Sequence, residues 1–175
     1  MHVVSSLDGF IAAKDNSIAW MDTEDVYENG ATDNGGEEVL QSIDCYVLGS
    51  RTYEHALELG WPYGDTPVVV MTSRELPFSR ESVEFYSGDP KTLVDEILAP
   101  RYRSIWLVGG AIVCRSFLQL GCVDEIRLMI APVTLGDGLH LFGDSGVEQK
   151  WHLQNVVGYK NGFVELSYRR QATES

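Results

Sequence analysis

The sequence predicts an α/β protein with an open, mostly parallel sheet that is flanked by helices in three layers. Three short runs, 46–48, 68–71 and 105–108, are apolar without alternation, a pattern typical of strands covered on both faces. Helical stretches alternate with the strands, and this alternation favours an open α/β sheet.

The end of the chain predicts an antiparallel hairpin, which makes the sheet mixed. Two extended stretches, 151–159 and 163–169, flank the segment Lys160-Asn161-Gly162. The Asn-Gly pair is a strong hairpin signal because both residues tolerate positive φ. The chain has 175 residues, enough to bury a sizeable core, and we expect a single domain over residues 1–175.

Local signals place the remaining elements. We expect further strands at 3–4, 10–13, 83–86 and 125–131, and helices at 37–43, 51–59, 90–98 and 111–120. Asp89 offers a side-chain acceptor just before Pro90, which is typical of a helix start, and Pro100 is expected to end that helix. Residues 15–36 are polar and predict a long loop, and loops of that length are usually functional.

Composition excludes several functional classes. The chain has 26 Asp and Glu against 13 Lys and Arg, a formal net charge of -13, and its basic residues are scattered. We therefore expect neither nucleic acids nor anionic membranes as partners. No apolar run approaches the ~18 residues of a membrane span, and no signal peptide is visible, so we expect a cytoplasmic protein. The spacing of His and Cys predicts no metal site.

Three segments that follow apolar strands carry residues suited to phosphate: 49–52, 72–74 and 109–111. They combine glycines, hydroxyls and arginines with helix starts, where backbone N–H groups bind anions. Ligands of open α/β sheets bind beyond the carboxyl ends of the strands. Recurrence at three such ends therefore predicts a ligand with more than one phosphate. A dinucleotide fits, and the arginines suit an extra phosphate, which favours NADPH over NADH.

Five motifs in chain order resemble the dihydrofolate reductase-like superfamily, and most closely its RibD C-terminal reductase branch. They are residues 6–12 (SLDGFIA), 47–54 (VLGSRTYE), 70–74 (VMTSR), 107–110 (LVGG) and 124–138, which ends in APVTLGDG. The resemblance covers nearly all of the chain, and its last motif is more similar to the riboflavin branch than to dihydrofolate reductase proper. The zinc deaminase signatures of the fused riboflavin enzyme are absent, so the chain resembles a stand-alone reductase domain.

The resemblance implies NADPH-dependent hydride transfer. The residues it implies for cofactor binding are Val4, Ile11, Ala12, Gly49, Ser50, Arg51, Thr52, Thr72, Ser73, Arg74, Gly109, Gly110, Ala111 and Ile112. The arginines, Thr52 and Ser73 would hold the phosphates and the adenosine end, and residues 109–111 would lie against the pyrophosphate. The first three residues would edge the nicotinamide, mostly through the backbone.

The resemblance also implies a substrate site near Trp20, beside a mobile loop that closes over the cofactor. As an isolated aromatic in a polar loop, Trp20 could instead only plug the edge of the core. Dihydrofolate reductase has a carboxylate where this chain has Asn34-Gly35-Gly36, and the adjacent Asp33 is our candidate catalytic and substrate-binding residue. The threonine that pairs with that carboxylate falls near Met129.

We therefore expect a reductase of a nitrogen heterocycle or its ring-opened ribosyl derivative, a small-molecule substrate. The best single candidate is 5-amino-6-(5-phosphoribosylamino)uracil, an intermediate of riboflavin biosynthesis. Two alternatives stay open: dihydrofolate or pterin reduction through Asp33, and a non-catalytic NADP-binding scaffold. The hairpin at 151–169 carries more apolar side chains than one sheet face needs, which predicts a homodimer.

Overall fold

The computed structural model describes residues 1–32, 40–78, 80–143 and 146–172. The chain divides into two compact units. We call residues 37–122 the central unit and residues 1–36 with 123–175 the terminal unit. Both units combine sheets with connecting segments, and the expected mixed α/β class is confirmed. That the two units act as one domain stays a prediction.

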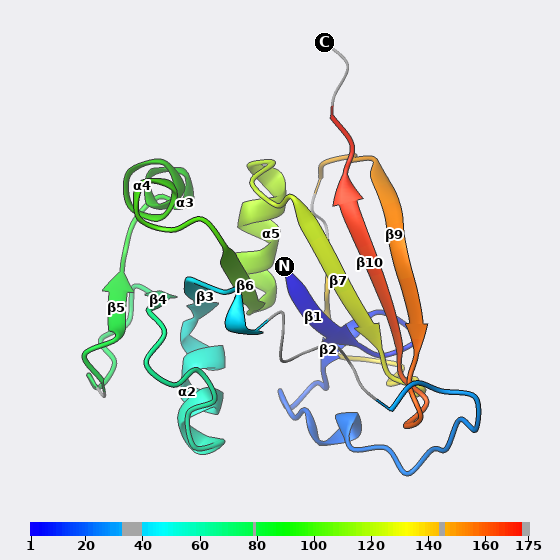
Figure 1. The fold of residues 1–175 in the computed structure, drawn as a ribbon. Coiled ribbons are helices and arrows are strands. Elements are labelled where there is room, and N and C mark those ends of the chain that lie inside the picture. Colours follow the sequence, from blue (N-terminus) through cyan, green and yellow to red (C-terminus); the bar gives the residue numbers. More distant parts are fainter. Residues whose placement is uncertain (33–39, 79, 144–145, 173–175) are drawn as a thin grey trace. The chain divides into compact units, whose positions relative to one another are not determined.

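The central unit is built on a parallel four-stranded sheet with the order β5-β4-β3-β6 (Figure 1). Its strands are β3 (Cys45–Gly49), β4 (Val68–Met71), β5 (Val83–Tyr86) and β6 (Ile105–Gly109). Every residue of β3 is buried, which confirms the expectation drawn from its unbroken apolar run. The central strands of this sheet are therefore covered on both faces.

Two nine-residue helices follow strands of this sheet. They are α2 (Ser50–Glu58), after β3, and α5 (Ala111–Gln119), after β6. The buried face of α2 presents Tyr53 and Ala56, which pack in one core cluster with Tyr46 and Leu48 of β3. A sheet-facing stripe of this kind fixes α2 against the strands that precede and follow it.

A third helical stretch runs through Pro100, which corrects the expectation that this proline ends it. The stretch comprises α3 (Pro90–Thr92), the π turn η2 (Leu93–Leu98) and α4 (Ala99–Arg101). In η2 the N–H of Ala99 donates to the carbonyl of Val94, five residues back. The wider π turn ends at Leu98, two residues before the proline, and the helix then ends at Arg101.

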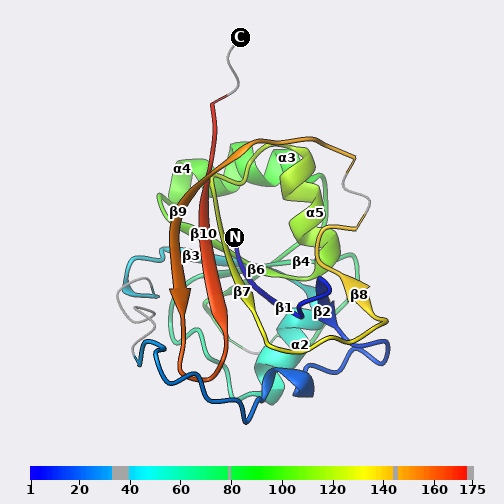
Figure 2. The same cartoon turned by 90° about the vertical axis from the view of Figure 1, so that its right-hand side faces the viewer.

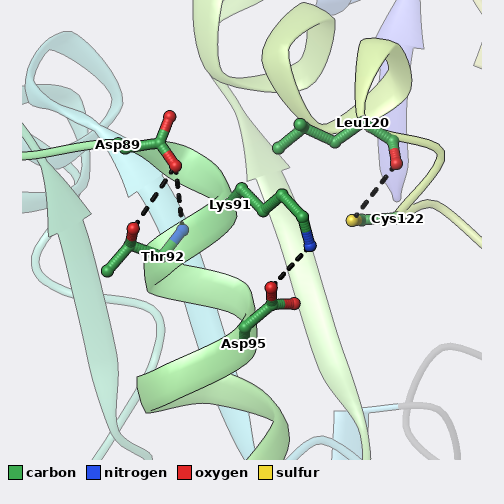
Figure 3. A network of polar contacts seen from close by, with 6 residues as sticks. All are labelled: Asp89, Lys91, Thr92, Asp95, Leu120 and Cys122. Atoms are coloured by element: carbon green, nitrogen blue, oxygen red, sulfur yellow. Dashed lines mark hydrogen bonds and ion pairs between the residues drawn. The ribbon is translucent and has the colours of Figure 1, made fainter.

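The start of that stretch agrees with its sequence signal. The Asp89 carboxylate accepts a hydrogen bond from the Thr92 N–H at 3.0 Å (Figure 3). Within the same stretch, Lys91 donates to Asp95, four residues on, at 2.5 Å. An N-cap acceptor followed by Pro at the first helical position satisfies the helix start locally.

The terminal unit is built on a mixed four-stranded sheet with the order β1-β7-β10-β9 (Figure 2). Its strands are β1 (His2–Ser5), β7 (Glu125–Ile130), β9 (Trp151–Gly158) and β10 (Val164–Arg170). β1 pairs with β7 in parallel, and the other two pairings are antiparallel. A second, two-stranded sheet pairs β2 (Phe10–Ala12) with β8 (Leu139–His140), and β8 has no counterpart in the predicted elements. A short 3₁₀ helix, η1, spans Ala19–Met21.

The predicted hairpin is present as β9 and β10, but its turn differs from the expected one. Only Gly162 has positive φ, at 80°, and Asn161 does not. The Tyr159 N–H donates to the Phe163 carbonyl at 2.8 Å, and the Gly162 N–H donates to the Tyr159 carbonyl. The connection is therefore a three-residue loop that ends in a left-handed glycine, a common hairpin geometry.

Asp8 ties two loops of the terminal unit together. Its carboxylate accepts hydrogen bonds from the Ser6 hydroxyl at 2.5 Å and from the Gly136 N–H at 2.7 Å. It also accepts from the Leu135 N–H at 3.1 Å. These donors, the Ser6 hydroxyl first among them, lower the pKa of Asp8 to about 2. Asp8 is a turn residue that holds residues 135–136 in place.

We predict that Asp8→Asn loosens the loop at 135–136. A neutral amide is a weaker acceptor than a carboxylate, so the backbone N–H groups of Leu135 and Gly136 should exchange faster with deuterium at neutral pH, measured by NMR. In the wild type the folded pKa lies below the usual value of 3.8, so the stabilisation is complete above about pH 4 and is lost as the pH falls through about 2.

Asp15→Asn is the matched control, because Asp15 accepts a local bond from the Ser17 N–H, two residues away. Equal exchange at 135–136 in Asp8→Asn and the wild type would show that the carboxylate does not hold this loop.

Candidate functional site

The three segments predicted to bind phosphate lie at one edge of the central unit's parallel sheet. Gly49 of β3 is in register with Met71 of β4, and Leu48 of β3 is in register with Gly109 of β6. Segments 49–52, 72–74 and 109–111 therefore leave neighbouring strands at their carboxyl ends. Open α/β sheets bind ligands at this edge.

The paired glycines come within van der Waals distance of the first segment. A Cβ added to Gly110 would lie 3.7 Å from the Thr52 Oγ1 and 3.7 Å from the Gly49 Cα. Gly110 also has a φ of +87°, in the left-handed region that side chains disfavour. The backbone conformation accounts for glycine here, and the ordinary van der Waals distances show that segments 49–52 and 109–110 lie against one another.

The two helices that begin at these junctions have N-termini without side-chain caps, which we call open. Gly49 and Gly110 occupy the N-cap positions of α2 and α5, and neither helix has a side-chain cap hydrogen bond or an acidic residue in its first turn. Exposed N–H groups and the positive end of the helix dipole favour an anion there. Two such ends beside one another suit a pyrophosphate.

The side chains of the two first turns differ in character. Ser50 and Arg51 open α2, and Arg51 is exposed. Ala111 and Ile112 open α5, and Ile112 is 78% exposed. The first turn of α2 thus adds positive charge, whereas the first turn of α5 offers backbone and apolar surface.

Arg74 is held by a residue that sequence reasoning missed. Its guanidinium donates to both carboxylate oxygens of Glu54 on α2, at 2.7 and 3.1 Å. The backbone N–H of Arg74 also donates to the Thr72 hydroxyl at 2.9 Å. The ion pair raises the pKa of Arg74 and lowers the pKa of Glu54. Nothing local marks Glu54, because its pairing depends on how α2 packs beside the end of β4.

The expected nicotinamide residues belong to the terminal unit. Val4 lies in β1, and Ile11 and Ala12 lie in β2. Val4 and Trp20 are partly buried against an apolar cluster that also contains Met129, and the Trp20 indole N–H donates to the Ser17 carbonyl at 3.2 Å. Trp20 therefore closes the edge of a core cluster on the same sheet as Val4. Its role toward a substrate stays a prediction.

The candidate catalytic residue Asp33 lies outside the described residues. Met129, where the resemblance places a threonine, has no hydroxyl, but its neighbour across the sheet is a carboxylate: Glu165 of β10 is in register with Met129 and only 6% exposed. The alternating pattern of β10 gave no sign of this burial.

Two further searches of the described ranges gave negative results. No group of three or more His, Cys, Asp and Glu side chains within them could hold a metal ion. No helix within these ranges combines the length and the apolar character that a membrane crossing requires.

The parallel sheet, two helix starts without side-chain caps and the adjoining basic side chains form an edge suited to an anionic ligand. The family model of the RibD C-terminal domain matches residues 1–164. The chain belongs to this family, and the resemblance drawn from the sequence is confirmed.

Solved structures show the same fold. A putative riboflavin biosynthesis protein from Shewanella sp. PV-4 is 24% identical, with a TM-score of 0.84 over 98% of this chain and 97% of its own. The deaminase and 5-amino-6-(5-phosphoribosylamino)uracil reductase of Thermotoga maritima is 18% identical, with a TM-score of 0.66 over 97% of this chain and 55% of its own. Dihydrofolate reductase from Enterococcus faecalis, complexed with NADP(H), is 18% identical, with a TM-score of 0.62 over 98% and 95%.

Proposed function

We propose that this protein is an NADPH-dependent reductase that transfers a hydride to a nitrogen heterocycle or a ribosylaminopyrimidine. The observation that carries the proposal is the meeting of two open helix N-termini with Arg51 and the Thr72–Arg74 segment at one edge of a parallel sheet. Membership of the RibD C-terminal domain family supports an oxidoreductase.

The residues of the central unit fit a dinucleotide with an extra phosphate. The starts of α2 and α5, with Thr52 and Gly110, would hold the pyrophosphate through backbone N–H groups. Arg51, with Ser73 and Arg74, would hold the phosphate of the adenosine end, since guanidinium groups bind phosphate bidentately. NADP(H) in the fold relative from E. faecalis supports this cofactor.

The terminal unit would receive the reacting end. Val4, Ile11 and Ala12 would edge the nicotinamide, and Trp20 with Asp33 would contact the substrate. NADPH supplies the hydride, and the protein's task is to hold donor and acceptor close together with water excluded. The substrate we propose is 5-amino-6-(5-phosphoribosylamino)uracil, which would place the protein in riboflavin biosynthesis in the cytoplasm.

The direct test is an NADPH consumption assay with purified protein. We expect loss of NADPH absorbance with 5-amino-6-(5-phosphoribosylamino)uracil, and no loss with dihydrofolate. Tight NADPH binding without turnover on either compound, or on a panel of pterins, pyrimidines and quinones, would instead favour the non-catalytic scaffold. Turnover on dihydrofolate that Asp33→Asn abolishes would favour the pterin alternative.

A second prediction concerns cofactor choice. Glu54 forms an ion pair with the guanidinium of Arg74. The 2′-phosphate of NADPH must therefore displace Glu54 or share the guanidinium with it. Glu54→Gln should therefore tighten NADPH binding by roughly three- to tenfold, the scale of one charged contact, and leave NADH binding unchanged because NADH lacks this phosphate. Fluorescence titration of both cofactors measures the ratio.

Glu58→Gln is the matched control, since Glu58 is an exposed carboxylate on the same helix. Equal effects of the two substitutions, or equal gains for NADH and NADPH, would contradict a specific contact between Arg74 and the 2′-phosphate.

We also propose a homodimer formed through the C-terminal hairpin. Leu153 and Val156 of β9 and Val164 of β10 are 47%, 53% and 36% exposed, and β9 is an edge strand. Exposed apolar side chains on an edge are typical of association surfaces.

Leu153→Lys with Val156→Lys should shift a dimer to a monomer in sedimentation velocity, and a wild-type monomer at micromolar concentration would exclude the proposal.

A further inference from the structure

Glu165 occupies an unusual place on the terminal unit's sheet. Its register partners are Met129 on β7 and Val157 on β9, and Met129 is in turn opposite Val4 on β1. Residues in register on neighbouring strands point to the same face. A charged side chain therefore follows Val4 and Met129 across one face of the sheet. Among the described residues, Glu165 is the one charged side chain that is buried.

The contacts of Glu165 are long for a buried carboxylate. It accepts hydrogen bonds from the Tyr159 hydroxyl at 3.2 Å and the Ser167 hydroxyl at 3.4 Å, and the nearest Arg127 nitrogen lies at 3.9 Å. Strong bonds to a carboxylate are shorter, about 2.5–2.9 Å, and a carboxylate has room for roughly four donors. Since a polar group loses hydration on burial, Glu165 has the capacity for further donors.

A cavity of about 410 Å³ lies against this carboxylate. Its size falls within the range of about 300–1,000 Å³ that small-molecule sites occupy. Val157 and Tyr159 line the cavity. Tyr159 is also a member of an apolar core cluster, against which Val157 and Trp20 pack. On other sides it is lined by polar side chains such as Asn155 and Ser167. The cavity thus offers apolar surface and a carboxylate side by side.

The charged side chains that line the cavity form two ion pairs, a short one and a long one that includes Glu165. Glu125 and Arg169, which also line the cavity, form an ion pair at 2.6 Å and offset each other. The pKa of His2 on β1 is raised by Glu165, but burial has the larger effect and lowers the pKa of His2 to about 4, so His2 is neutral at pH 7. Arg127 forms a long ion pair with Glu165, at 3.9 Å, so a ligand with N–H donors at hydrogen-bond distance from Glu165 would compete with Arg127.

We propose that this cavity binds a flat ligand group that presents two adjacent N–H donors to Glu165, an amidine-type N–C–N edge. Two parallel N–H groups match the two carboxylate oxygens, as in arginine–carboxylate pairs, and the plane of the group packs against Val157 and Tyr159. Glu165 is then the residue that selects for ligands with this edge. That the ligand is also the hydride acceptor rests on the proposed function, but its recognition does not.

Benzamidine tests the recognition without any cofactor, because it carries the amidine edge on an aromatic ring. In NMR titrations of the full-length protein we expect binding in the millimolar range, with shifts at Val157, Tyr159 and Glu165. Glu165→Gln should weaken it at least roughly tenfold, the scale of one charge-assisted bidentate contact. Glu125→Gln, the matched control on the same cavity, should change it less than about twofold.

Asn155→Leu provides an independent variant, because it narrows the cavity and keeps Glu165. It should also weaken benzamidine, even if Glu165→Gln fails to fold. Benzamide, which replaces one donor with a carbonyl oxygen, should bind more weakly than benzamidine. The proposal is overturned if benzamidine does not bind, or if neither Glu165→Gln nor Asn155→Leu weakens it by more than the control does.

The outcome is separate from that of the reductase proposal. Binding of benzamidine through Glu165 in a protein that binds no NADPH would keep this site and reject the cofactor assignment. NADPH turnover in a protein that does not bind benzamidine would support the reductase proposal and reject this site.

Discussion

Parallel pairing of β3, β4 and β6 is the constraint on which the candidate cofactor site depends. Because these strands run in the same direction and in register, the segments after them leave at one edge, and both nine-residue helices start there. No single segment would bind a dinucleotide well. The shared edge makes two helix dipoles and several backbone N–H groups available to one anion. Gly110 lies against Gly49 and Thr52 and adopts a φ of +87°, a conformation that glycine allows.

Charge at this edge is balanced within the central unit. The chain as a whole is strongly acidic, with a formal net charge of -13, yet phosphate recognition depends on local groups because solvent and salt screen distant ones. Glu54 neutralises Arg74, whereas the first turns of α2 and α5 carry no acidic residue. The backbone N–H groups at these helix starts therefore face no first-turn carboxylate, and the availability of Arg74 is set by a competing carboxylate, Glu54.

In the terminal unit, by contrast, a carboxylate, that of Glu165, is buried on a face of the sheet. Glu165 lies in the same cross-strand row as the apolar Val4 and Met129. A buried carboxylate destabilises a fold unless donors surround it, and the printed partners of Glu165 are two hydroxyls, of Tyr159 and Ser167, in long hydrogen bonds and Arg127 at 3.9 Å. Such an arrangement is typical of a site that a ligand completes, and it gives this sheet face a chemistry that the central unit lacks.

The sequence by itself determined the local elements and the family. Apolar runs without alternation identified β3, β4 and β6, Asp89 and Pro90 marked a helix start, and five ordered motifs indicated the RibD C-terminal domain family, since each of these signals is carried by neighbouring residues. Tertiary structure alone decided the pairing of Glu54 with Arg74, the burial of Glu165 and the helix that continues through Pro100. The first two depend on the packing and register of segments distant in the chain, and the third depends on a π turn that no residue type announces.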